Sequence, residues 1–242
     1  MYTLHIANKN YSSWSLRPWV LMRQLSIPFV ERLSAFDSGS FHAFSPSGRV
    51  PCLHDHDIVI WDSLAIAEYL AERHPGVWPA DPQARAWARC AAAEMHSGFG
   101  VLRQHCGMNC GVRCRLKEIP AALQLDIQRI DALWTEGIGR FGGPYLGGGK
   151  FSAVDAFFAP VAFRVRTYDL ALGQVAAEYA RRMLELPAMQ SWFAEALQEP
   201  WRDRAHEEEL GQYGTVTEDQ RSAISATSAG MAGDDGSPPR DR

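Results

Sequence analysis

Apolar and polar positions follow two different periods along the chain, and the change of period divides it into two parts. The apolar runs at residues 2–6 and 29–33 have the length and pattern of strands, and residues 16–25 between them are spaced as a helix. Because this connection is long enough for a crossover helix, we expect the two strands to be parallel. The chain therefore begins with a predicted βαβ unit.

Two shorter apolar runs follow, at residues 49–54 and 58–61, and a turn rich in aspartate separates them. This spacing predicts a β-hairpin. Pro51 cannot donate a ladder hydrogen bond, so it belongs at the start or the edge of its strand. Residues 63–73 carry apolar side chains at helical spacing. The first part of the chain thus has the order βαβ–ββα.

A proline-rich segment at residues 75–82 marks the predicted domain boundary, because beyond it the apolar residues recur only at helical spacing. We expect a first domain at 1–76, a linker at 77–82 and an all-helical second domain at 83–208. From residue 209 on, the composition turns to Gly, Ser, Thr, Asp and Pro. Such a segment buries too little apolar surface to offset its ordering entropy, so 209–242 is predicted to be a disordered tail.

The polar turn at residues 10–19 links the first strand to the first helix and contains Ser12, Ser13 and Ser15. Backbone N–H groups at a helix start, together with the helix dipole, favour an anion above such a turn. We interpret Pro18 as a first-turn proline, whose missing N–H costs no hydrogen bond. An ordinary cluster of capping serines is the alternative interpretation.

Composition and charge exclude several classes of function. The 242 residues carry a formal net charge of -4, so a nucleic-acid partner is not expected. No apolar run approaches the length of a membrane-spanning helix and the N-terminus lacks a leader pattern, so we expect a cytoplasmic protein with no membrane partner. Five cysteines, an odd number, fit reduced thiols. Cys106, Cys110 and Cys114 lack the spacing of paired zinc ligands, so no metal is expected.

Four short motifs stand in an order typical of one family. They are the serine turn SSWS at 12–15, RVPCL at 49–53, WDSLAIAEYL at 61–70 and the capping-box pair Ser152 and Asp155. In these motifs the chain resembles a cytosolic glutathione transferase, whose Val-Pro-x-Leu element contains a proline that follows a cis peptide bond.

The resemblance implies a thioredoxin-like N-terminal βαβ–ββα domain followed by an all-helical glutathione-transferase C-terminal domain, and a homodimer. The serine turn is most similar to the serine-type classes zeta, phi and tau and to bacterial relatives that begin SSWSLRPW. Trp14 stands where the zeta class has a cysteine. We therefore expect a serine-type, zeta-like bacterial member that has lost this cysteine.

The resemblance also implies which residues bind glutathione, the expected co-substrate. Asp62 would bind its α-ammonium group, and the hydroxyl and N–H of Ser63 would hold its α-carboxylate. The backbone of Val50, held by cis-Pro51, would pair with the cysteinyl unit, and Arg49 would add a charge contact. Capping of the following helix is the alternative role for the Asp62–Ser63 pair.

Ser12 is the expected hydrogen-bond donor to the glutathione thiolate. If the alignment with the family is shifted by one residue, Ser13 is the donor instead. The thiolate would attack a small hydrophobic electrophile in conjugation, isomerisation or peroxide reduction. Arg164, Arg166 and Tyr168, on the helix that begins after Ser152, are candidates to line the electrophile site, and solvated positions are the alternative. The alternatives are an isomerase of the maleylacetoacetate type and a non-catalytic binding module of the same fold.

Overall fold

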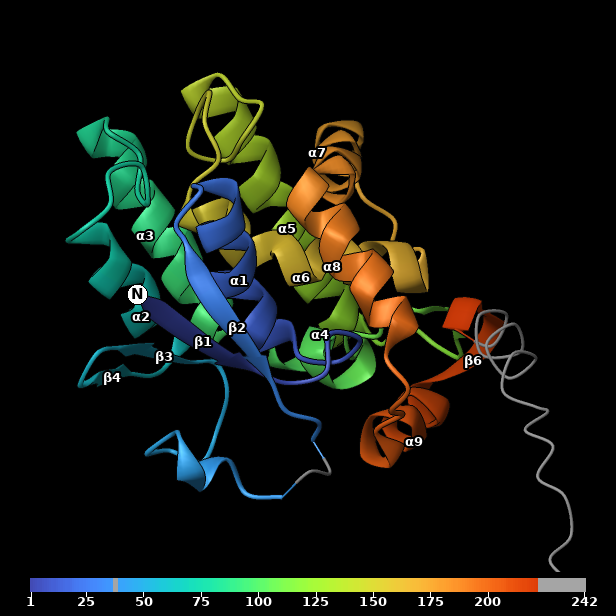
Figure 1. The fold of residues 1–242 in the computed structure, drawn as a ribbon. Coiled ribbons are helices and arrows are strands. Elements are labelled where there is room, and N and C mark those ends of the chain that lie inside the picture. The colour runs from blue at the N-terminus through green and yellow to red at the C-terminus, as the bar shows by residue number, and fades with distance from the viewer. Residues whose placement is uncertain (37–38, 222–242) are drawn as a thin grey trace, which may run out of the picture.

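The computed structural model describes residues 1–36 and 39–221, and it contains a sheet domain followed by a helical domain (Figure 1). The sheet has four strands in the order β2-β1-β3-β4. Their bounds are β1 Tyr2–Ile6, β2 Phe29–Leu33, β3 Cys52–Asp55 and β4 Ile58–Ile60. Strands β1 and β2 are parallel, whereas β3 runs antiparallel to both β1 and β4. The predicted βαβ unit and β-hairpin are confirmed.

Helices α1 (Ser13–Gln24) and α2 (Ser63–Ala71) complete the sheet domain. The start of α1 differs from the prediction, because the N–H of Leu16 already donates to the carbonyl of Ser12 at 3.2 Å. Pro18 therefore lies inside the helix and not in its first turn, and the first-turn interpretation is wrong. The cost is one helical hydrogen bond, which residue 18 would otherwise donate to the carbonyl of Trp14.

The second domain packs around one central helix. Its helices are α3 Pro82–Ser97, α4 Gly100–His105, α5 Ala121–Phe141, α6 Ala153–Tyr168, α7 Gln174–Glu185, α8 Pro187–Gln198 and α9 Arg204–Tyr213. Helix α6 is buried along almost its whole length and contacts α1, α3 and α7, so it joins the two domains. None of the helices in the described part of the chain is both long and apolar enough to span a bilayer.

The start of α6 confirms the predicted capping box. The carboxylate of Asp155 accepts the backbone N–H of Ser152 at 2.9 Å, and both halves of the box are formed. Asp155 also accepts the N–H of Leu146 and the hydroxyl of Tyr179, each at 2.9 Å. One buried carboxylate therefore fixes the helix start, the preceding loop and α7 together.

The second domain is not all-helical, which corrects one expectation. Strand β5 (Val112–Leu116) pairs antiparallel with β6 (Gly214–Asp219), and the two form a separate small sheet. The pattern of residues 83–208 could not predict this pairing, because the partner strand lies about one hundred positions further along the chain than β5.

The predicted disordered tail is also wrong over residues 209–221, which include the end of α9 and all of β6. The side chain of Arg221 is buried there, and it donates to the hydroxyl of Tyr11 at 2.7 Å and to Glu207 at 2.8 Å. These contacts with distant segments supply the stabilisation that the local composition lacks. The rest of the predicted tail, 222–242, lies outside the described residues.

The buried ammonium group of Lys9 connects the two domains next to the serine turn. Lys9 is 2 % exposed, and its ammonium group pairs with Glu31 at 2.7 Å and with Glu195 on α8. The rings of Trp19 and Trp192 lie 5.2 and 5.5 Å from the same nitrogen. The charge is thus enclosed by two carboxylates and two aromatic faces.

Candidate functional site

Two adjoining cavities lie where the first strand–helix turn meets the second domain. The cavity that we call the serine cavity has a volume of about 330 Å³ and is lined by Ser12 and Ser13. The second, the Asp62 cavity, measures about 400 Å³. Trp14, Arg49 and Val50 line both cavities, so the two form one continuous candidate site.

The serine turn presents hydroxyl groups that are not used for capping. Ser12 is the N-cap residue of α1, but its side chain makes no capping hydrogen bond. Its hydroxyl donates instead to Oγ of Ser15 at 2.7 Å, and that oxygen also accepts the N–H of Ala7 at 3.3 Å. The alternative of an ordinary capping cluster therefore does not describe Ser12.

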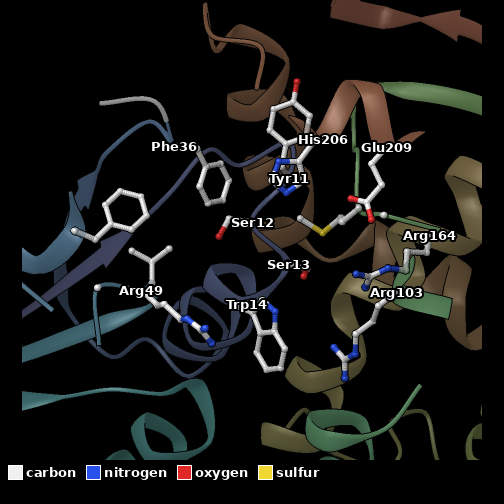
Figure 2. A pocket seen from close by; sticks show the side chains of 15 residues that line it. Tyr11, Ser12, Ser13, Trp14, Phe36, Arg49, Arg103, Arg164, His206 and Glu209 are labelled. Carbon is white, nitrogen blue, oxygen red and sulfur yellow. The ribbon is translucent and has the colours of Figure 1, made fainter. Parts of the chain in front are cut away.

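The two serines differ in the walls that they face. Figure 2 shows Ser12 on the side of Arg49, and Ser13 on the side of Arg103 and Arg164. The first wall belongs to the sheet domain and the second to the helical domain. The site therefore has a compartment from each domain, with the start of α1 between them.

The segment before β3 supplies the sheet-domain wall. The peptide bond between Val50 and Pro51 is cis, as predicted. Arg49 and Val50 border both cavities, and Pro51 borders the Asp62 cavity. The three residues thus lie at the candidate site.

Asp62 and Ser63 lie at the start of α2 but have different surroundings. Asp62 caps the helix by accepting the N–H of Leu64 at 2.8 Å, and its half-exposed carboxylate lines the Asp62 cavity. Ser63 is buried behind it, does not line either cavity, and accepts a hydrogen bond from Arg17 at 3.4 Å. The capping alternative therefore holds for Asp62, which still offers carboxylate surface to the cavity.

His96 on α3 also lines the Asp62 cavity, a position that its sequence context did not indicate. Its Nδ1 lies 3.7 Å from Oδ1 of Asp62, and its ring meets the ring of Trp14 edge to face at 5.3 Å. Burial lowers the pKa of His96, and the positive charges of Arg17 and Arg103 act in the same direction, whereas Asp62 opposes them. The imidazole is therefore mainly neutral at pH 7.

Trp14 lines both cavities and also contacts two arginines, Arg17 and Arg103. The guanidinium of Arg17 lies 4.1 Å from the centre of the Trp14 ring, and that of Arg103 lies 4.9 Å from it. Burial lowers the pKa of Arg17, and the nearby charges of Arg103 and Arg164 lower it further. The indole face thus partly offsets charges that would otherwise be isolated from water.

Several lining residues come from places that sequence reasoning did not connect with the site. His206 on α9 lines the serine cavity and stacks on Tyr11, with ring centres 5.0 Å apart. Glu209 from the same helix and Arg103 from α4 also line it. The position of α9 depends on long-range contacts of Arg221 and β6, so no local pattern could have identified these residues.

The cysteines of the 106–114 segment do not converge on one point of this site. Cys106 follows α4, Cys110 lies in the next loop and Cys114 belongs to β5. Burial raises the pKa of both Cys106 and Cys110 to about 12, so neither is a reactive thiolate. Within the described residues no three potential ligands form a group able to hold a metal ion.

Comparisons with known proteins agree with this geometry. Residues 11–73 match the family described as "Glutathione S-transferase, N-terminal domain". The glutathione S-transferase-like protein OpS6 of Beauveria bassiana is 26% identical over 156 residues, which span 59% of this chain and 72% of that protein. A probable maleylacetoacetate isomerase of Caenorhabditis elegans is 34% identical over 94 residues, or 37% of this chain and 44% of the relative.

A solved structure extends the likeness to both domains. It is a glutathione transferase homologue from Burkholderia with bound glutathione, with a TM-score of 0.60 and 23% identity. The match covers 81% of this chain and 97% of that structure. Residues 11–73 thus match the glutathione S-transferase N-terminal domain family, and the fold of both domains is shared with a solved glutathione transferase homologue.

Proposed function

We propose that this protein is a glutathione transferase that activates the glutathione thiol as a thiolate and directs it at a small electrophile. The single observation that carries the proposal is the meeting of Ser12, Val50 and Asp62 around one continuous site. The family match over residues 11–73 supports the same proposal.

In the proposed complex, glutathione occupies the Asp62 cavity and extends toward the serine turn. Its α-ammonium group pairs with Asp62, and the backbone of Val50, beside cis-Pro51, pairs with the cysteinyl unit. Arg49 adds a positive charge. Ser63 acts through its backbone N–H at the start of α2, because its hydroxyl is turned toward Arg17.

The serine turn then stabilises the thiolate. A free thiol has a pKa of about 8.5, and a shift of about two units corresponds to about 2.7 kcal/mol. A charge-assisted hydrogen bond contributes about 1.5–3 kcal/mol, and a helix N-terminus adds about 0.3–1 kcal/mol. One hydroxyl donor at the start of α1 is therefore sufficient, and no general base is required.

We assign Ser12 as this donor, because it faces Arg49 and the strand that would hold glutathione. Each hydroxyl has one donor hydrogen and two acceptor lone pairs. When the Ser12 hydrogen turns toward sulfur, Ser15 can donate to Ser12 Oγ across the same 2.7 Å contact. Ser15 is then a positioning residue for Ser12. A serine-type, zeta-like assignment and a homodimer belong to the same proposal and rest on the family resemblance. A cytoplasmic location is proposed with them.

The test measures glutathione binding by calorimetry and thiolate formation by ultraviolet absorbance against pH, with conjugation of chlorodinitrobenzene as the activity. Ser12→Ala is expected to lower kcat/KM about 10- to 100-fold and to raise the thiol pKa, while the glutathione Kd changes less than about threefold. Ser97→Ala, at the exposed end of α3, is the matched control.

The same measurements on Ser13→Ala decide between the two serines. Loss of the thiolate in Ser13→Ala but not in Ser12→Ala would transfer the role to Ser13. A thiolate that survives in both variants would contradict activation by the serine turn. Failure of the wild type to bind glutathione would remove the transferase proposal and favour a binding module of the same fold.

A further inference from the structure

Two arginines of the helical domain line the serine cavity on the side of Ser13 (Figure 2). Arg164 on α6 is 3 % exposed, and Arg103 on α4 is partly buried. Arg17 lies behind them against Trp14. Buried cations in folded proteins are normally paired with carboxylates, because an isolated charge loses its hydration.

In the described part of the chain, these two guanidinium groups donate hydrogen bonds to backbone carbonyls. Nε of Arg164 donates to the carbonyl of Cys106 at 2.7 Å. Arg103 donates to the carbonyls of Gly98 and His96 at 2.9–3.2 Å, and also to that of Met95. Within residues 1–36 and 39–221, neither guanidinium forms an ion pair with a carboxylate.

Each group also keeps a buried nitrogen without an acceptor in the described part of the chain: Nη1 of Arg103 and Nη1 of Arg164. Buried polar atoms are paired in the great majority of cases, so two such atoms beside one cavity require an explanation. An anion in the serine cavity would compensate the two charges through the surface that Arg103 and Arg164 present to it.

The arginines remain charged at neutral pH. Burial lowers the pKa of Arg164 to about 10, and the charge of Arg103 adds to this effect. Burial also lowers the pKa of Arg103, and Asp126 opposes this effect. Asp126 does not line the cavity, and its carboxylate accepts the N–H of Leu102 at 2.9 Å. Two like charges of this kind attract an anion into the space between them.

Glu209 is the one carboxylate among the residues that line the serine cavity in the described part of the chain. It is exposed on α9, and Figure 2 shows its side chain reaching toward Arg164 from the rim. A water-exposed carboxylate weakly offsets the buried charge. It also competes with an anion that enters the cavity.

We propose that the electrophile carries a carboxylate, which Arg103 and Arg164 bind while the reacting carbon lies next to the serine turn. This inference rests on the proposed function and narrows the small hydrophobic electrophile expected from the family resemblance to one that carries a carboxylate. A carboxylate supplies two acceptor oxygens in the plane that a guanidinium prefers. Phe36 and Met108 leave an apolar surface for the body of the same molecule.

The chemical step leaves the carboxylate unchanged. The thiolate sulfur forms a bond to the electrophilic carbon, and the leaving group departs with the electron pair of its bond to that carbon. The thiol proton has already passed to solvent. The arginines therefore act in binding and orientation, so their removal weakens the carboxylate preference and leaves the thiolate itself in place.

The test compares two conjugates that differ by one charge, S-benzylglutathione and S-(para-carboxybenzyl)glutathione, by calorimetry on the full chain. The wild type is expected to bind the carboxybenzyl conjugate about 10-fold more tightly. Arg164→Met and Arg103→Met are each expected to reduce this ratio of affinities, carboxybenzyl to benzyl conjugate, below about threefold. Neither change should weaken the binding of S-benzylglutathione. Arg164→Lys, which keeps the charge, retains part of the ratio.

Two further variants control the comparison. Arg166→Met removes the same charge two positions along α6, where the side chain donates to the carbonyl of Cys110 and does not line the serine cavity. It is expected to keep the wild-type ratio. Glu209→Gln removes the competing carboxylate and should raise the ratio about two- to threefold. Because Glu209 is exposed, this variant tests the proposal even if Arg164→Met fails to fold.

Three outcomes would overturn the inference. Equal binding of the two conjugates by the wild type would disprove the carboxylate site and leave the transferase proposal standing. A weaker affinity of both arginine variants for glutathione itself would assign the arginines to the carboxylates of glutathione.

If the wild type binds neither glutathione nor a conjugate, the proposed transferase function is disproved, and the anion site needs a separate test. Free para-nitrobenzoate and para-nitrobenzamide then test the anion site alone. A preference for the benzoate that disappears in Arg164→Met supports the site, and equal binding of the two compounds is the third overturning outcome.

Discussion

Lys9 and Arg164 are both buried cations close to the serine turn, but their surroundings are opposite. Lys9 is enclosed by Glu31, Glu195 and two tryptophan rings. Arg164 has a carbonyl on one nitrogen and an unpartnered Nη1 beside a cavity. The same kind of charge is thus compensated at one place and left uncompensated a short distance away.

The contrast separates a structural charge from a binding charge. Where the fold supplies the carboxylates that pair with a buried cation, removal of the cation leaves those carboxylates without compensation and destabilises the protein. Where no partner is built in, the charge costs stability in the unliganded protein, and its attraction remains available to a ligand. Measurements of the free energy of unfolding for variants of Lys9 and Arg164 therefore test whether the two charges differ in this way.

The largest effect is expected from Lys9→Met, because the change isolates two carboxylates at the junction of the domains. The free energy of unfolding should fall by about 2–4 kcal/mol. This loss is smaller than for a fully buried ion pair, because the Glu195 side chain is 43% exposed. Urea denaturation followed by tryptophan fluorescence measures it. Lys117→Met, an exposed lysine that donates to two carbonyls, is the control. Equal losses in both variants would contradict a structural role for the buried pair.

A smaller effect is expected at an exposed pair of good geometry. Arg129 donates to both carboxylate oxygens of Glu94 at 2.7 and 2.9 Å, although both side chains are well exposed. Arg129→Gln should reduce the free energy of unfolding by about 0.2–1 kcal/mol, because water and salt screen the pair. The loss should shrink further in high salt. A loss as large as that of Lys9→Met would show that burial does not explain the difference between the Lys9 ion pairs and the exposed Arg129–Glu94 pair.

The smallest effect is expected from Arg164→Met, despite its deep burial. The variant loses one hydrogen bond to Cys106 but also an isolated charge, so its free energy of unfolding should lie between unchanged and about 1 kcal/mol higher. The same urea titration measures it, with Arg166→Met alongside. A loss above about 2 kcal/mol would mean that Arg164 is a structural charge like Lys9.

Local signals predicted the strands of the sheet domain and the start of α6. The cis peptide before Pro51 was expected from the family resemblance, whereas the strand periods and the capping box of Ser152 and Asp155 each depend on residues within a few positions of one another. Such features are encoded by short-range sterics and hydrogen bonds, which a single sequence reveals.

The features that the sequence did not reveal depend on distant partners. The start of α1 is an exception, because it is set locally: Pro18 indicated a first-turn position, whereas the helix begins five residues before it. The pairing of β5 with β6 and the convergence of Arg103 with Arg164 join segments far apart in the chain. The groups that surround a buried arginine likewise come from distant segments, so the sequence alone does not show whether its charge is compensated.

The hydrogen bond between Arg221 and Tyr11 also fixes an order of assembly. The two residues are 210 positions apart, and the sheet domain is complete at Ala71, long before Arg221 is synthesised. Domains generally fold as they emerge from the ribosome, N-terminal part first. The wall of the serine cavity made by His206 and Glu209 is thus added to a finished sheet domain, and a nascent chain completes this cavity last.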